Sequence, residues 1–165
     1  MTDASDSRPT SIVLSVCLRC RDGLEDAYDG ERGGARLAKA IAAAIAEDRG
    51  SLPALEARGM RCMSQSARPC TISLGSPDAF TYLFGDLDPD RHAADVLSLL
   101  RIYAGSATGF MGRDERPEPM RAGILGRIPP LHRPHEIVEP LHSAPVYERA
   151  SHAAGAAIPN DPDRN

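Results

Sequence analysis

The four cysteines are the residues of this chain best suited to carry chemistry. Two residues separate Cys17 from Cys20, and seven separate Cys62 from Cys70. A spacing of two is the shortest that lets two thiolates converge on one metal ion or one cluster iron. The wider second spacing is not that of a standard zinc knuckle, which weakens the case for zinc. Two buried core cysteines are the plain alternative, because cysteine is among the most buried residue types.

The same Cys17-x-x-Cys20 spacing occurs in thiol–disulfide oxidoreductases, where a helix N-terminus after the motif lowers the pKa of the first thiol. Here the next helical pattern begins only at Ala35, fifteen residues beyond Cys20. We therefore expect the helix dipole to act on neither thiol. Disulfide exchange ranks below metal binding on this ground.

The sequence around the first cysteine pair predicts a strand followed by a helix. Residues 12–16 (IVLSV) form a β-branched run that ends at Cys17, as expected of a buried strand. After a loop rich in Gly and Asp, apolar residues with helical spacing predict a helix over 35–48. Its expected buried stripe consists of Leu37, Ala38, Ile41, Ala42 and Ile45.

The later segments predict a hairpin and a second helix. Residues 59–63 are expected to form a strand end or turn that carries Cys62, and the runs CTISLG and AFTYLFG predict an antiparallel hairpin. Asp88 is the expected helix cap, with Pro89 at the first helical position. The predicted apolar face of that helix consists of Ala93, Val96, Leu97, Leu100, Tyr103 and Ala104. MRAGILGRI is expected to dock as a short element.

This order of elements predicts an α/β domain with a thioredoxin-like arrangement: a small mixed sheet with two main helices, built from a right-handed crossover and an antiparallel hairpin. We expect a disordered N-terminus over 1–10, the domain over 11–128, and a largely disordered Pro- and His-containing tail over 129–165. His132, His135, His142 and His152 could bind metal loosely in that tail, although their irregular spacing matches no fixed site.

Composition narrows the classes of partner. The formal net charge is -4, so no basic stripe is expected to bind nucleic acid. The polar, acidic first eleven residues do not resemble a signal peptide, and no apolar window is long enough for a membrane span. We therefore predict a cytoplasmic protein without membrane contact, in a compartment where paired thiols more often bind metal than form structural disulfides.

Three groups of segments carry a family resemblance: VCLRCRDG; MRCMSQSARPCTISLGSPDAFTYLFGDL; and AADVLSLLRIYAGSATGF with RPEPMRAGILGRIPP. Over roughly residues 12–130, the chain resembles an uncharacterised bacterial family of predicted metal-binding proteins. That family is similar to the thioredoxin-like [2Fe-2S] ferredoxins, and its members are often encoded beside genes for cobalamin synthesis and cobalt handling.

The resemblance implies that Cys17, Cys20 and Cys62 are ligands of a metal centre. In the family a further cysteine usually follows the third ligand after three intervening residues, and this chain has Ser66 there. The fourth ligand is therefore expected to be Cys70 or the oxygen of Ser66, unless the site has three thiolates and an open position. An oxygen ligand would favour the oxidised cluster.

The expected function is that of a [2Fe-2S] electron carrier rather than an enzyme, with a redox or metal-handling protein as partner and a homodimer as an open option. The acidic loop after Cys20 could meet a basic redox partner, or it is simply solvated. The alternative function is a protein that binds or delivers zinc or cobalt without a redox role. A domain that has lost its cluster and serves as an interaction module is a third reading.

Overall fold

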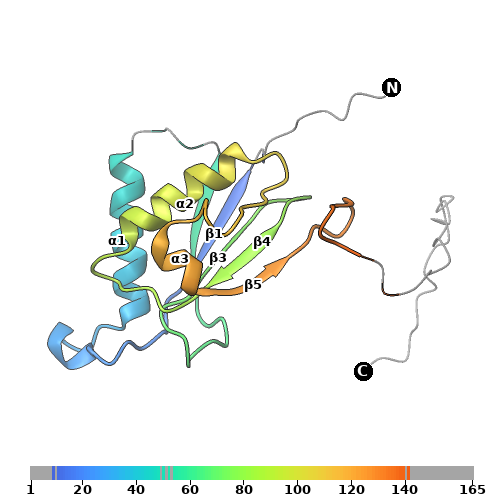
Figure 1. Ribbon diagram of the computed structural model, residues 1–165. Helices are drawn as coiled ribbons and strands as arrows, with labels where there is room; N and C mark the ends of the chain where they lie inside the picture. The colour runs from blue at the N-terminus through green and yellow to red at the C-terminus, as the bar shows by residue number, and fades with distance from the viewer. Residues whose placement is uncertain are drawn as a thin grey trace, which may run out of the picture. The chain divides into compact units, whose positions relative to one another are not determined.

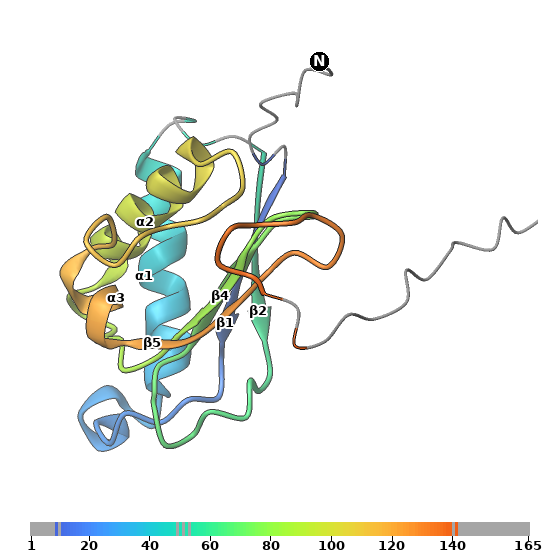
Figure 2. The ribbon, with the colours of Figure 1, turned by 45° about the vertical axis from the view of Figure 1, so that its right-hand side comes forward.

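The computed structural model describes residues 9, 11–48, 50, 52, 54–139 and 141. These residues form a mixed α/β structure in which α1 and α2 lie on one face of a five-stranded sheet (Figures 1 and 2). The elements in chain order are β1 (Ile12–Cys17), the 3-10 helix η1 (Glu25–Tyr28), α1 (Gly33–Glu47), β2 (Leu55–Met60), β3 (Ile72–Gly75), β4 (Thr81–Phe84), α2 (Ala93–Gly105), α3 (Glu118–Ala122) and β5 (Ile124–Ile128). None of the helices described is long and apolar enough to cross a bilayer.

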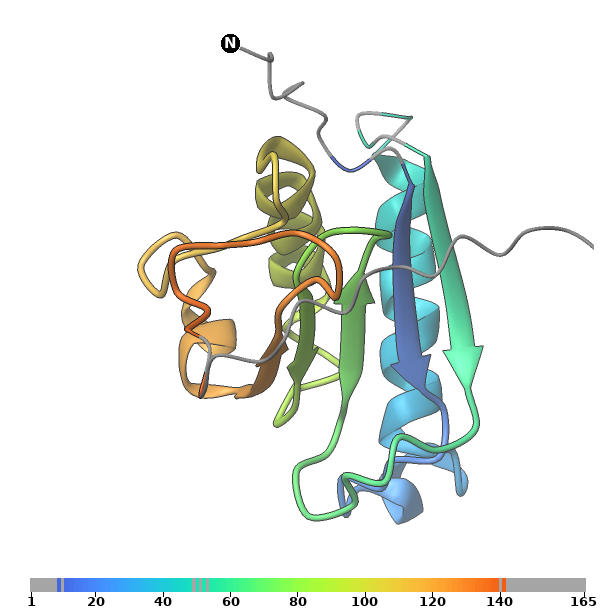
Figure 3. The same cartoon turned by 90° about the vertical axis from the view of Figure 1, so that its right-hand side faces the viewer.

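The sheet has the strand order β2-β1-β3-β4-β5. Strands β1 and β2 are parallel and are connected through α1, whereas β1–β3, β3–β4 and β4–β5 are antiparallel. The predicted hairpin is therefore confirmed as β3 and β4. Figure 3 looks onto the sheet face that α1 and α2 leave uncovered.

The core lies between the sheet and the two long helices. Leu14 pairs in register with Leu74, which pairs with Tyr82, and all three are fully buried. Partners in register point to the same face of a sheet, so these strands present one continuous apolar layer. The helices contribute the buried residues Leu37 and Ile41 from α1 and Val96, Leu99, Leu100 and Tyr103 from α2.

The predicted stripe of α1 is wrong at one position. Leu37 and Ile41 are buried, but Ala42 is exposed. Ala42 lies roughly 100° around the helix axis from Ile41. Burying its single methyl group would contribute little to stability, so this side of the helix faces solvent. The first turn instead buries Gly33, Gly34 and Arg36, which the apolar pattern did not indicate.

The predicted start of the second long helix is also wrong, because α2 begins at Ala93. The Asp88 carboxylate accepts a hydrogen bond from the Asp90 N–H at 2.9 Å and pairs with Arg91 Nε at 2.6 Å. His92 occupies the N-cap position, and its Nδ1 accepts the Asp88 N–H at 3.0 Å. Residues 88–92 therefore form a separate turn, and the capping signal belongs to that turn.

The segment expected only to dock as a short element forms α3 and the edge strand β5, which pairs with β4. Beyond it, the His135 ring lies 4.8 Å from the Phe80 ring and 5.0 Å from that of Phe110. The described residues after His135, 136–139 and 141, belong to a second unit. The predicted tail ligands His142 and His152 lie outside the described residues.

Candidate functional site

Cys17 and Cys20 lie together at the end of β1, and both are buried. The Cys17 N–H donates to the Thr71 carbonyl at 2.9 Å. The Cys20 thiol is 3.9 Å from Thr71 Oγ1. The end of β1 is thus joined to the residue just before β3, which brings Cys70 to the same part of the molecule.

The first turn of α1 packs directly on the Cys17–Cys20 segment. The Gly34 N–H donates to the Cys20 carbonyl at 3.1 Å, and a Cβ at Gly34 would overlap the Cys17 carbonyl oxygen. Figure 3 shows the end of β1 and the start of α1 at the same edge of the domain. We expected the loop after Cys20 to separate the helix from the thiols, but residues 21–32, which include η1, bring the first turn of α1 back onto the Cys17–Cys20 backbone.

The two thiols of the pair have opposite pKa shifts. Burial alone would raise the pKa of Cys17, but hydrogen bonds from the Cys20 thiol and from backbone N–H groups of Arg19, Met63 and Cys20 outweigh it and lower that pKa. Burial raises the pKa of Cys20, and its hydrogen bond to Cys17 raises it further. Of the two thiols, Cys17 therefore loses its proton more readily than Cys20.

Cys70 is fully buried beside this pair. Burial raises its pKa to about 12, and the neighbouring Cys20 thiol and Asp22 carboxylate act in the same direction. Its backbone exchanges two hydrogen bonds with Leu87, each 3.3 Å long. Cys70 is thus a neutral thiol at neutral pH when no metal is bound.

The pKa of Cys70 predicts a loss of stability at alkaline pH in the metal-free protein. A thiol protonated more tightly in the folded state than at its ordinary value near 9 favours folding below pH 9, and this contribution falls as the pH rises toward 12. We expect the free energy of unfolding, measured in urea between pH 8 and 11, to decline less steeply for Cys70→Ala than for the unmodified chain. Equal slopes for the two proteins would contradict the assignment.

Cys62 and Ser66 do not join the group. Cys62 is exposed, and its Sγ accepts the Ser64 N–H at 3.3 Å. Ser66 is exposed on the same loop. Within the described part of the chain, no three His, Cys, Asp or Glu side chains are gathered closely enough to hold a metal ion. The backbone N–H of the adjacent Met63 helps to lower the pKa of Cys17, so the loop that carries Cys62 passes near the pair.

Exposure predicts which thiol reacts first. In chelator-treated native protein at neutral pH, we expect iodoacetamide to modify Cys62 rapidly, because the other three cysteines are at most 5% exposed. Peptide mapping by mass spectrometry would locate the label, and Cys62→Ser should remove the fast phase. Rapid labelling of Cys17 would instead mean that its thiolate is accessible to reagents.

The cysteine pattern did not indicate a cluster of Arg36, Asp22, Asp90 and Tyr28 that holds the loop after Cys20 against α1. Arg36 is 7% exposed, and its Nη2 lies 2.7 Å from Asp22 and 3.7 Å from Asp90. Its guanidinium carbon lies 3.6 Å from the centre of the Tyr28 ring, whose hydroxyl donates to Asp90 at 2.8 Å. An arginine within the otherwise apolar start of α1 was the signal available in the sequence.

The neighbouring carboxylate favours the charged form of Arg36. Burial works against the charge of Arg36, but the hydrogen bond and negative charge of Asp22 outweigh it and raise the pKa of Arg36. The hydrogen bond to Asp90 raises the pKa of Tyr28. Of the acidic loop residues, Glu31 pairs with Lys39 at 2.6 Å. The cluster therefore fastens residues 21–31 to α1 and to the turn before α2.

Comparison with known proteins gives one result at the level of the family. No curated protein and no solved structure matches the chain. One family profile, described as "Protein of unknown function (DUF1636)", matches residues 14–130. The match includes all four cysteines and every strand and helix from α1 to β5. The chain therefore belongs to the uncharacterised protein family DUF1636.

Proposed function

We propose that the protein binds a metal centre through cysteine thiolates, and that this centre is a [2Fe-2S] cluster serving as an electron carrier. The observation that carries the proposal is the burial of Cys17 and Cys20 together at the end of β1, in the region that also holds the buried Cys70. Backbone N–H groups of Arg19, Cys20 and Met63 lower the pKa of Cys17, and hydrogen bonds to cluster sulfurs help to set reduction potentials.

The donor set fits such a centre in part. Cys17 and Cys20 are both buried at the end of β1, and Cys70 is a third buried thiol in the same region, but no three of the described side chains are gathered closely enough to hold a metal ion without rearrangement. Cys62 would complete the set after the loop over 61–69 turns inward, and Ser66 is the alternative oxygen donor. A bound cluster would supply one-electron chemistry, while the chain supplies thiolates and the N–H groups that face them.

The sheet topology supports the finer part of the proposal, a thioredoxin-like domain. Strands β1 and β2 form a parallel pair connected by α1, and the β3–β4 hairpin lies antiparallel beside β1. This is the crossover followed by a hairpin that the sequence predicted, with β5 as an addition. The link to cobalamin metabolism rests on the resemblance alone, a redox or metal-handling partner rests on the resemblance and on the acidic loop after Cys20, and a homodimer stays an open option.

Metal and acid-labile sulfide analysis with a visible spectrum tests the proposal, on protein purified without oxygen and without a metal-affinity tag. We expect about two irons and two sulfides per chain, lost in Cys17→Ser and Cys20→Ser. Comparing Cys62→Ser, Cys70→Ser and Ser66→Ala then identifies the remaining ligands. About one zinc or cobalt per chain without sulfide would establish the alternative, a binding or delivery protein. A colourless, metal-free protein would contradict both.

Thiol–disulfide exchange is a second candidate, favoured by a different observation. The pKa of Cys17 is lowered while that of Cys20 is raised, and the first turn of α1 packs on the pair. This asymmetry is the one an attacking and a resolving thiol require. The burial of Cys17, 3% exposed, argues against it. Reduction of a small disulfide substrate that is lost in Cys17→Ser would favour this candidate.

A further inference from the structure

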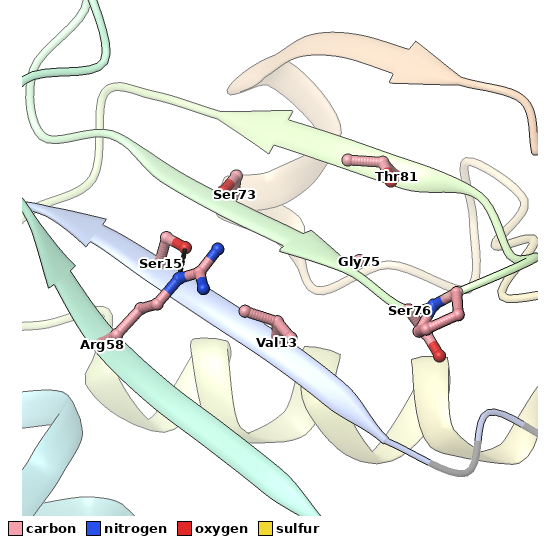
Figure 4. Close-up of a pocket in the computed structure, with 8 residues that line it drawn as sticks. Val13, Ser15, Arg58, Ser73, Gly75, Ser76 and Thr81 are labelled. Carbon is pink, nitrogen blue, oxygen red and sulfur yellow. Dashed lines mark hydrogen bonds between the residues drawn. The ribbon is translucent and has the colours of Figure 1, made fainter. Parts of the chain in front are cut away.

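We propose that the sheet face opposite the helices carries a binding site for a small oxyanion, phosphate or carboxylate, centred on Arg58. A groove of about 270 Å³ lies there, lined by Val13, Ser15, Arg58, Ser73, Gly75, Ser76, Pro77 and Thr81 (Figure 4). None of the four cysteines lines it. The inference is therefore independent of the proposed metal centre.

Strand register gathers the polar groups of this groove. Ser15 on β1 pairs with Arg58 on β2 and with Ser73 on β3. Partners in register point to the same face of a sheet. A guanidinium and two hydroxyls thus form one row across three neighbouring strands, away from the apolar layer that faces the helices.

The guanidinium of Arg58 is held in place over β1. Its Nε donates to Ser15 Oγ at 3.0 Å, and Ser15 is only 4% exposed. Figure 4 shows the planar group extending from β2 across β1, with its terminal nitrogens beyond the Ser15 hydroxyl. Fixing a long side chain in advance lowers the entropy cost of binding, and a planar guanidinium suits the two oxygens of a phosphate or carboxylate.

Further donors surround the position that an oxyanion would take. In the described part of the chain, the hydroxyls of Ser73, Ser76 and Thr81 make no side-chain hydrogen bond to protein. Gly75 keeps the groove open, because a Cβ there would lie 2.8 Å from Thr81 Oγ1. The volume is just below the roughly 300–1,000 Å³ of pockets for drug-sized ligands, so the site suits a small anion.

The carboxylate of Glu56 would compete with a bound oxyanion for the guanidinium of Arg58. Its Oε1 lies 3.3 Å from Arg58 Nη1, and the two side chains are 62% and 58% exposed. An exposed pair of this kind contributes little stability and is easily exchanged. A bound oxyanion would take the place of this carboxylate, so removing the negative charge of Glu56 should strengthen binding.

The test is an NMR titration of the full-length, ¹⁵N-labelled protein with inorganic phosphate and, separately, with succinate, at constant ionic strength. We expect saturable shifts of the Arg58 Nε–Hε signal and of the Ser73 and Gly75 amides, with a dissociation constant near or below about 1 mM for at least one of the two. Saturation by phosphate alone would identify a phosphate-bearing ligand, and saturation by succinate alone a carboxylate.

Variants decide whether the groove is responsible. Arg58→Gln should weaken binding at least about tenfold, because charge-assisted hydrogen bonds are lost. Thr81→Val, which keeps the shape and the cation, should weaken it several-fold, and Glu56→Gln should strengthen it. Arg91→Gln, which removes an exposed arginine outside the groove, should bind as the unmodified chain does. Shifts that grow linearly without saturation, or that persist unchanged in Arg58→Gln, would overturn the proposal.

Discussion

Replacing Gly34 with alanine should destabilise the domain severely, by about 3 kcal/mol or more, the upper end of the range for overpacked sites. The new Cβ would overlap the Cys17 carbonyl oxygen and approach the Cys20 nitrogen at 3.1 Å. Both atoms belong to the backbone, so no side-chain rotation can relieve the overlap. The first turn of α1 would have to move away from the cysteine pair. Urea denaturation followed by circular dichroism would measure the loss.

Gly105→Ala is the matched control for this prediction. Gly105 is the last residue of α2, and nothing lies within 4 Å of the position its Cβ would occupy. Alanine is a better helix former than glycine by up to about 1 kcal/mol, so this variant should be neutral or slightly stabilised. Similar stability of the two variants would show that α1 is not packed against the Cys17–Cys20 segment as described.

Replacing Arg36 with glutamine should cost about 2–3 kcal/mol of unfolding free energy. The substitution leaves the carboxylate of Asp22, 13% exposed, without its partner. It also removes the cation that lies over the Tyr28 ring. Because the site keeps some contact with solvent, the expected cost lies below that of breaking a fully buried ion pair. Chemical denaturation at pH 7 would measure it.

A double-mutant cycle with Asp22→Asn separates this interaction from general damage to α1. If the ion pair is the cause, the double variant should be more stable than the sum of the single effects predicts. Lys39→Gln is the control on the same helix, because the Lys39 side chain is 74% exposed and pairs with Glu31 at the surface. It should change stability by less than about 1 kcal/mol. Additive effects of Asp22→Asn and Arg36→Gln would contradict the conclusion that this ion pair fastens residues 21–31 to α1.

Local sequence patterns predicted most of the regular elements. The β-branched run before Cys17, the β3–β4 hairpin and the two long helices follow from residue types and from the periods of apolar residues. The sequence patterns gave wrong or incomplete predictions where contacts with other segments decide the local structure. Asp88 has the chemistry of a helix cap, but its carboxylate serves the turn that contains Asp90 and Arg91. The strand β5 is short and contains Gly126, and its hydrogen bonds form only when it pairs with β4.

The sequence by itself determined which residues could do chemistry, because thiols and their spacing are properties of the chain. It identified Cys17 and Cys20 as a pair, and the structure brings them into contact with Cys70 beside them. Only the tertiary structure decided which thiol of the pair has the lowered pKa, since the groups that lower the pKa of Cys17 come from residues both near and distant in sequence. The tertiary structure also decided that the first turn of α1 packs on the Cys17–Cys20 segment, that Cys62 is exposed, and that a groove forms at Arg58. Each depends on contacts between segments far apart along the chain, about which local propensity carries no information.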